Sequence, residues 1–253
     1  MALSTKDLAA RRGASPEPRV VGLLGGMSWP SSEVYYREIN RAVQARRGGS
    51  HSARVLLWSD DYRTVEQMQL AGDWAGAGEL LASAARRLEA GGADLLAIAC
   101  NTMHRVAAAV REASNLPFID LVEATAREVQ RHGISRAVVL GTGFTLDLPL
   151  YPERLRAHGI EPMRPAAGDR ALLDRLIYDE LCVGVVTDGA RRRLAELIER
   201  AVDQGANGVV LACTELGLIA DRATVAGAPI VDSTQAHIAA LVDASLEPLE
   251  ATS

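Results

Sequence analysis

Hydrophobic and polar residues alternate along the chain in segments of two lengths. Short runs of β-branched and other apolar residues are typical of buried strands, and longer segments with apolar residues near helical spacing are typical of amphipathic helices. The strands expected from this pattern are 19–24, 53–58, 94–99, 117–120, 136–140, 208–212 and 229–232. Helices are expected between them in segments such as 31–46, 75–90, 103–113, 122–132 and 191–204. This alternation predicts an α/β fold in which parallel sheets carry helices on both faces.

Two pairs of motifs indicate an internal repeat. A Gly-rich turn follows an expected strand at Gly25 and again at Gly141, and an apolar strand ends in a cysteine at Cys100 and again at Cys213. The glycine and the cysteine are 75 positions apart in the first copy and 72 in the second. This matched spacing predicts two similar Rossmann-like or flavodoxin-like lobes related by a pseudo-two-fold axis. Chance similarity between two short motifs is the alternative.

The overall charge argues against nucleic acid, and the hydropathy argues against a membrane. The formal net charge is −5 and the pI is about 5.6, so no basic surface for phosphates is expected. No run approaches the roughly 20 apolar residues that cross a bilayer, and no apolar signal segment begins the chain. We therefore expect a cytoplasmic location. The polar residues 1–18, which contain two prolines, predict a mobile leader.

Lysine is almost absent, and this excludes two classes of enzyme. Of the 27 basic residues only Lys6 is a lysine, and it lies in the expected leader. A pyridoxal-phosphate enzyme needs a lysine for its Schiff base, and a P-loop needs one at the phosphates. We therefore expect neither a pyridoxal-phosphate enzyme nor a P-loop nucleotide site.

Cys100 and Cys213 stand at the ends of expected strands. Ligands of open parallel sheets bind at the carboxyl ends of strands, so two lobes packed with these ends together would put the cysteines on opposite sides of one cleft. Moving a proton off an amino-acid α-carbon and returning it from the other face needs a base and an acid, and two sulfurs can exchange these roles. The helix start expected after each cysteine should lower the thiol pKa. The polar pairs 101–102 and 214–215 should supply donors and helix caps there.

Alternative interpretations of these motifs stay open. A single cysteine at the end of an apolar strand is usually a small core residue, and Cys182, which lacks matching surroundings, is interpreted in this way. The Gly-rich turns lack the full dinucleotide-binding pattern. Backbone amides at 26–28 and 142–145, with the hydroxyls of Thr142 and Thr145, are instead expected to hold a substrate carboxylate. A plain tight turn is the alternative.

The histidines and serines suggest no further catalytic site. No two of the five histidines share metal-ligand spacing together with a carboxylate at i+3 or i+4, so no metal is expected. His104 either orients a group near Cys100 or is structural. A serine hydrolase is also excluded, because no Gly-x-Ser-x-Gly motif occurs.

At these motifs the chain resembles the aspartate/glutamate racemase family, and within it the broad-specificity amino-acid racemase branch. The resemblance spans about residues 20–242 and is carried by three ordered motifs, which are 22–29 with Tyr35 and Tyr36, 100–104, and 213–217. It implies two α/β lobes of similar topology, an active site in the cleft between them, and usually a homodimer. It also implies catalysis without pyridoxal phosphate, metal or nucleotide.

The resemblance also implies site residues and domain limits. The C-terminal segment should return to the first lobe, which is then 19–118 plus 232–253, while the second lobe is 119–231. Cys100 and Cys213 would be the two acid/base residues of an amino-acid racemase or epimerase. The residues implied to hold the small-molecule amino-acid substrate are Met27, Ser28, Gln69, Asn101, Thr102, Thr142, Thr145 and Thr214.

The chain departs from dedicated aspartate racemases at the substrate's side chain. Those enzymes bind the side-chain carboxylate with a basic pair that includes a lysine, and region 180–182 offers none, which argues against aspartate. Arg63 is either the arginine of that pair or a solvated loop residue. Two other functions stay open, namely a related cysteine-dependent carbanion enzyme (hydantoin racemase or malonate-type decarboxylase) and a non-catalytic amino-acid-binding module. Because decarboxylating relatives keep only one cysteine, the presence of both argues against decarboxylation.

Overall fold

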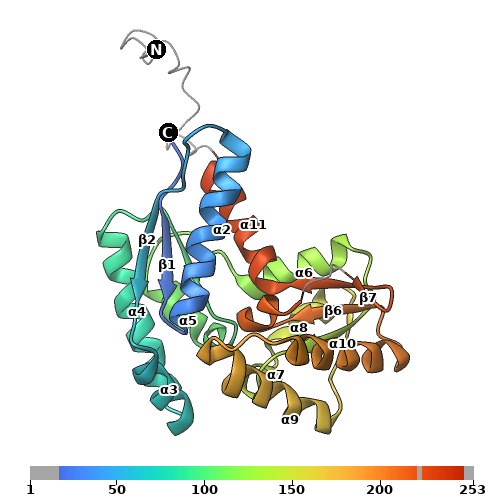
Figure 1. Cartoon of the computed structure of the whole chain (residues 1–253). Coiled ribbons are helices and arrows are strands. Elements are labelled where there is room, and N and C mark those ends of the chain that lie inside the picture. The colour runs from blue at the N-terminus through green and yellow to red at the C-terminus, as the bar shows by residue number, and fades with distance from the viewer. Residues whose placement is uncertain (1–16, 221–223, 248–253) are drawn as a thin grey trace.

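Two sheets of mainly parallel strands form the framework of the molecule (Figure 1). The computed structural model describes residues 17–220 and 224–247, so nearly all of the predicted leader lies outside the described residues. The first sheet has the order β2-β1-β3, with bounds β1 Val21–Gly25, β2 Val55–Ser59 and β3 Leu95–Ile98. The second has the order β5-β4-β6-β8-β7, with bounds β4 Arg136–Leu140, β5 Glu161–Met163, β6 Gly208–Leu211, β7 Thr224–Val225 and β8 Ala228–Asp232.

The strand order repeats between the sheets. The middle strand β1 pairs in parallel with β2 and β3, and β4 pairs in the same way with β5 and β6. A Gly-rich turn follows β1 and β4, and a cysteine follows soon after β3 and β6. The predicted α/β fold with parallel sheets is therefore confirmed. The exception is β7, which pairs with β8 antiparallel.

The strand predicted at 117–120 is wrong in length. It is reduced to a single parallel bridge between Leu96 and Phe118. The chain cannot extend further as a strand because Asp120 already caps the helix α6, Leu121–Arg131, by accepting the Glu123 N–H through its side chain at 2.9 Å.

Helices connect the strands, and acidic or hydroxyl side chains cap several of them. The longer helices are α2 Trp29–Arg47, α3 Tyr62–Ala71, α4 Trp74–Ala90, α5 Ala107–Ala113, α6 Leu121–Arg131, α8 Leu150–Ala157, α9 Ala167–Arg175, α10 Asp188–Asp203 and α11 Ser233–Leu246. The short segments are η1 Thr102–Val106, α7 Gly143–Leu146, η2 Leu176–Glu180, η3 Leu181–Val183 and η4 Thr214–Leu218. The predicted helix 103–113 is divided, because its first turn is the 3-10 segment η1.

The last helix packs against the first sheet. Ile238, Leu241 and Val242 of α11 share a buried cluster with Leu23 of β1 and Ile39 of α2. In Figure 1, α11 runs beside α2 and reaches toward the second sheet. The predicted limits of the two lobes stay a prediction.

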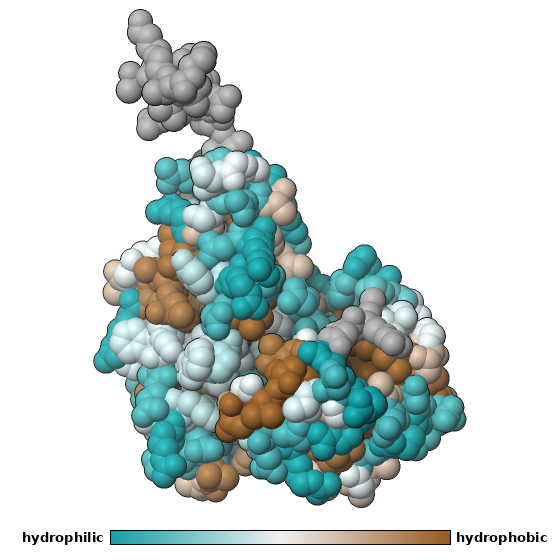
Figure 2. All heavy atoms as spheres, viewed as in Figure 1, coloured by the Kyte–Doolittle hydropathy of each residue, from teal (hydrophilic) through white to brown (hydrophobic). Residues whose placement is uncertain are grey.

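Several large apolar side chains remain exposed on the surface. The face in Figure 2 is mostly hydrophilic and is interrupted by hydrophobic patches. The exposed apolar residues include Trp29, Leu70, Val183, Val185 and Leu218. Among the described residues, no helix has both the length and the apolar composition that a bilayer crossing requires. The homodimer and the cytoplasmic location stay predictions.

Candidate active site

One pocket of about 40 Å³ collects residues from the strand ends of both sheets. All ten predicted site residues line it, and these are Met27, Ser28, Gln69, Cys100, Asn101, Thr102, Thr142, Thr145, Cys213 and Thr214. Six further residues complete the lining, namely Tyr62, Ile177, Tyr178, Cys182, Ala212 and Glu215. The structure therefore brings the ten predicted residues together in one pocket, whereas sequence analysis did not name the other six as site residues. Cys182, which was interpreted as a core residue, is a half-buried member of the pocket wall.

The backbone at Cys100 is held by a neutral histidine. His104 is buried, and its Nδ1 lies 2.8 Å from the carbonyl oxygen of Cys100. The Leu121 N–H donates to Nε2 at 3.1 Å, so Nδ1 carries the proton and donates to the carbonyl. Burial lowers the pKa of His104, which keeps the ring uncharged. Both hydrogen bonds of His104 go to backbone groups, so it is a buried structural residue that supports the turn carrying Cys100.

Polar side chains join the ends of the two sheets beside Cys100. The Asn101 amide donates to Ser233 Oγ at 3.1 Å, and its oxygen accepts from the Tyr151 hydroxyl at 2.5 Å. The hydroxyls of Thr102 and Thr145 lie 2.9 Å apart. Side chains of α7, α8 and α11 therefore hold the two polar residues that follow Cys100.

Thr142 prepares the second Gly-rich turn. Its hydroxyl accepts the Thr145 N–H at 3.3 Å and lies 3.2 Å from the Thr145 hydroxyl. This contact caps the short helix α7, Gly143–Leu146. The hydroxyls of Thr142 and Thr145 thus lie together in the pocket lining, whereas the Gly143 and Thr145 N–H groups already donate to Asp174 Oδ1 and Thr142 Oγ1.

The sulfur of Cys213 contacts a buried carboxylate. Its Sγ donates to Glu215 Oε2 at 3.1 Å. The other oxygen of Glu215 accepts from Ser28 Oγ at 3.0 Å and from Ser31 Oγ at 2.8 Å. Glu215 is 7% exposed, so these donors replace the water that a carboxylate needs. In the sequence, the only signal for Glu215 was an acidic residue two positions after a cysteine.

The expectation that helix starts lower both thiol pKa values is wrong. Burial raises the pKa of Cys100 to about 12, and it raises that of Cys213 well above its ordinary value, with Glu215 adding to the effect. The two segments that follow are 3-10 turns of five residues without a side-chain cap, so they offer only a few backbone amides. The cost of placing an anion in a dry pocket exceeds that gain.

The remaining lining residues surround the space near the cysteines. The Gln69 amide donates to Met103 Sδ at 3.2 Å and stays buried. Burial raises the pKa of Tyr62 and Tyr178 above the ordinary phenol value, so both phenols stay protonated at neutral pH. Arg63 is exposed and is not part of the pocket lining, which favours its interpretation as a solvated residue.

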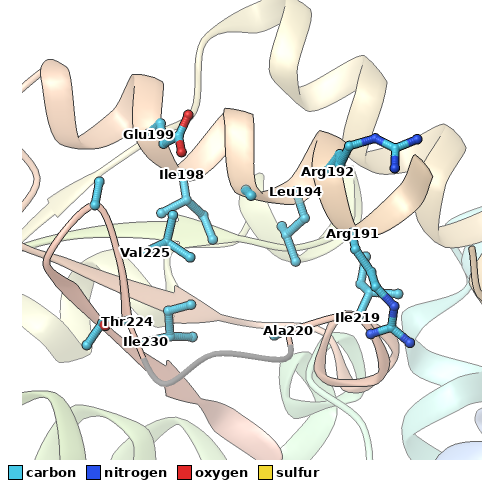
Figure 3. A pocket seen from close by; sticks show the side chains of 12 residues that line it. Arg191, Arg192, Leu194, Ile198, Glu199, Ile219, Ala220, Thr224, Val225 and Ile230 are labelled. Carbon is cyan, nitrogen blue, oxygen red and sulfur yellow. The ribbon is translucent and has the colours of Figure 1, made fainter. Parts of the chain in front are cut away.

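A larger cavity of about 260 Å³ lies elsewhere, between α10 and the β7–β8 edge (Figure 3). Leu194, Ile198, Val225 and Ile230 line it, with Arg192 at its rim. No thiol is among the described residues that line it, so the presence of the cysteines rather than size identifies the candidate site. Among the described residues, no group of three or more His, Cys, Asp or Glu side chains is arranged to hold a metal ion.

Comparison with known proteins places the chain among racemases. The family model for Asp/Glu/hydantoin racemases matches residues 24–241. Broad specificity amino-acid racemase RacX of Bacillus subtilis is 27% identical over 85% of this chain and 93% of its own length. A crystal structure of a Yersinia pestis protein assigned to the Asp/Glu racemases is 38% identical, with a TM-score of 0.83 over 90% of this chain and all of its own.

Two more distant structures resemble the chain. An aspartate racemase homologue from Pyrococcus horikoshii is 28% identical, with a TM-score of 0.78 over 90% of this chain and 100% of that one. Glutamate racemase of Francisella tularensis, in complex with D-glutamate, is 16% identical, with a TM-score of 0.60 over 95% of this chain and 86% of that one. The last comparison shows a shared fold only.

Proposed function

Because the chain belongs to the Asp/Glu/hydantoin racemase family, we propose that it racemises α-amino acids by proton transfer between the substrate and the two cysteines Cys100 and Cys213. The observation that carries this proposal is that both sulfurs line one pocket together with the hydroxyl residues Ser28, Thr102, Thr142 and Thr145. The enzyme is an isomerase, and the two-cysteine mechanism is the part proposed here.

The proposed reaction has two proton transfers. The thiolate of one cysteine takes the α-proton, the C–H electron pair stays on the substrate as a carbanion delocalised into the carboxylate, and an S–H bond forms. The thiol on the opposite face then gives its proton to the same carbon, which inverts the centre and leaves a thiolate on the second cysteine. No net oxidation or reduction occurs.

The polar wall is suited to the substrate's charged ends. Hydroxyls of Ser28, Thr102, Thr142 and Thr145 can donate to the α-carboxylate, whose negative charge grows as the carbanion forms. Glu215 is placed to attract the α-ammonium group. A bound ammonium also favours the nearby thiolate, and this offsets the effect of burial, which raises both thiol pKa values.

The lining also indicates which side chains are accepted. Glu215 is the only charged residue that lines the pocket in the described part of the chain, and no lysine, arginine or histidine joins it. A second carboxylate on the substrate would lack a cationic partner there. We therefore propose amino acids with uncharged side chains as substrates ahead of aspartate and glutamate.

Deuterium exchange tests this function. The purified protein is incubated in D2O with single L-amino acids, without pyridoxal phosphate, and the product is resolved by chiral chromatography and mass spectrometry. We expect the D-isomer to appear with deuterium at the α-carbon. Exchange of 5-substituted hydantoins alone, or carbon dioxide release from arylmalonates, would move the function to the related carbanion enzymes. Tight amino-acid binding without any exchange would indicate a binding module.

A further inference from the structure

The two cysteines differ in the residue two positions further along the chain. After Cys100 this residue is Thr102, a neutral hydroxyl, and after Cys213 it is Glu215. The Glu215 carboxylate accepts the thiol proton of Cys213 in a hydrogen bond of 3.1 Å. Cys100 has no acidic side chain as a hydrogen-bond partner among the described residues.

The position of the Glu215 carboxylate is fixed from the opposite sheet. Ser28 caps α2 and Ser31 lies in its first turn, and both hydroxyls donate to Oε1. These two donors leave Oε2 directed at Cys213. A carboxylate that receives three donors acts as an acceptor only, so the proton of the Cys213 contact belongs to the sulfur.

Cys100 has a different set of hydrogen-bond partners. Burial raises its pKa, as it does that of Cys213, but the backbone N–H groups of Met103 and Thr102 act on the Cys100 sulfur and favour its thiolate. At Cys213 one backbone N–H, that of Glu215, acts in the same sense. The other titratable groups that interact electrostatically with Cys100 are Glu215, Cys182, Tyr35 and Tyr62. Those around Cys213 are Glu215, Cys182 and Tyr178.

We infer that Glu215 is a positioning residue that makes the two sulfurs unequal, because its carboxylate holds the proton on Cys213 and leaves Cys100 as the thiol that ionises first. The inference rests on the proposed function for its catalytic meaning. Cys100 is then the resting base and Cys213 the resting acid. After one turnover the proton sits on Cys100, and the Cys213 thiolate faces the Glu215 carboxylate, so this form of the enzyme is the less stable one.

The difference between the two cysteines can affect only some of the kinetic constants. Two enantiomers of a free amino acid have an equilibrium constant of one, so kcat/KM must be the same in both directions. An energy difference between the two protonation forms of the enzyme can therefore appear only in kcat and KM separately. Glu215→Gln should bring the kcat values of the two directions closer together.

Site-resolved alkylation tests the inference without substrate. Wild type, Glu215→Gln and Glu215→Asp are treated with iodoacetamide between pH 7 and pH 10, and the labelling rate of each cysteine is read by peptide mass spectrometry. Since thiolate is the reacting form, Glu215→Gln should raise the Cys213 rate about tenfold, as a pKa lower by one unit would, and the Cys100 rate less than about threefold. Glu215→Asp keeps the charge and should restore slow labelling of Cys213.

The comparison within one cysteine removes differences in accessibility. Glutamine has the shape of glutamate, and circular dichroism checks that the variant is folded. An unchanged Cys213 rate in Glu215→Gln would overturn the inference, as would a Cys213 rate in Glu215→Asp that is as fast as the rate in Glu215→Gln. Either outcome leaves racemisation itself untouched, because that activity is measured separately by deuterium exchange.

Discussion

The ends of β3 and β6 place a cysteine in the same position but surround it differently. Behind Cys100 a neutral imidazole holds the backbone carbonyl, whereas beside Cys213 a carboxylate contacts the sulfur itself. The repeated strand order explains why two sulfurs meet in one pocket. Of the two neighbours that the repeat does not share, Glu215 contacts a sulfur, whereas His104 contacts only the backbone of Cys100. Position therefore comes from the repeat, and chemistry comes from the residues in which its halves differ.

The two Gly-rich turns also occupy matching positions in the repeat but need glycine for different reasons. Gly26 has φ +84°, and an added Cβ would lie 2.1 Å from the carbonyl oxygen of Asp60. Gly141 has an ordinary φ, and its added Cβ would lie 2.8 Å from the carbonyl oxygen of Ala212. The first turn thus requires glycine for its backbone conformation as well as for space, and the second for space alone.

Replacement of either cysteine is expected to have the largest effect. Cys100→Ala and Cys213→Ala each remove one of the two proton carriers, so racemisation should fall by about 10³-fold, within the range for loss of a general acid or base. Deuterium exchange from one enantiomer can survive where the remaining sulfur faces its α-proton. Chiral chromatography and mass spectrometry measure the two signals on the same sample.

Cys182→Ser is the matched control for this prediction. It removes a thiol from the same pocket wall without removing either proposed proton carrier. Its loss of activity should be far smaller than that of the other two variants. Equal losses in all three would show that pocket thiols act through packing, and the contrast between the two strand ends would lose its functional meaning.

The sequence was sufficient for the parts of the fold that repeat. Buried apolar strands such as 136–140 and the two cysteine turns follow local patterns, so they were predicted close to their observed limits. The strand β5, Glu161–Met163, was missed because it has three residues, one of them a proline. The helices α3, α8, α9 and α11 were also missed, and their amphipathic pattern is short or weak.

The role of Glu215 could not be predicted from local pattern. Its carboxylate is fixed by Ser31, which lies 184 positions earlier, and such a contact depends on how the two sheets pack. The thiol pKa values were predicted in the wrong direction for a similar reason. A helix start is visible in the sequence, but the burial that outweighs it is a property of the assembled pocket.

A glycine substitution tests the contrast between the two turns through stability. Gly26→Ala should cost about 3 kcal/mol or more of unfolding free energy, because a left-handed residue costs about 1–2 kcal/mol and the contact with Asp60 adds backbone strain. Gly141→Ala lacks the first contribution and should cost less. Urea denaturation followed by circular dichroism gives both values. A larger loss in Gly141→Ala would contradict the assignment.

The smallest predicted effect concerns two buried histidines behind Cys100, which have no equivalent behind Cys213 in the described chain. His237 accepts from the Tyr35 hydroxyl at 2.9 Å and donates to the Ile119 carbonyl at 2.9 Å. Burial lowers its pKa to about 3, and lowers that of His104 as well. The unfolded chain therefore binds more protons as pH falls below the ordinary histidine value of about 6.5. Stability is full above that pH and is lost below it.

Asp232 has the opposite effect on the pH dependence of the unfolding free energy, so the contributions of Asp232 and His237 can be separated. Burial raises its pKa to about 6, and the folded state therefore gains protons relative to the unfolded chain between pH 6 and about 3.8. Asp232→Asn keeps an acceptor for the Thr234 N–H and should steepen the loss below pH 6 by up to about 1.4 kcal/mol per pH unit, while His237→Gln should flatten it by a similar amount. Urea unfolding from pH 4.5 to pH 8 measures both slopes, with the exposed His51→Gln as control. If His237→Gln keeps the wild-type slope, the His237 ring takes up its proton in the folded state. The claim that this buried histidine stays neutral would then be disproved.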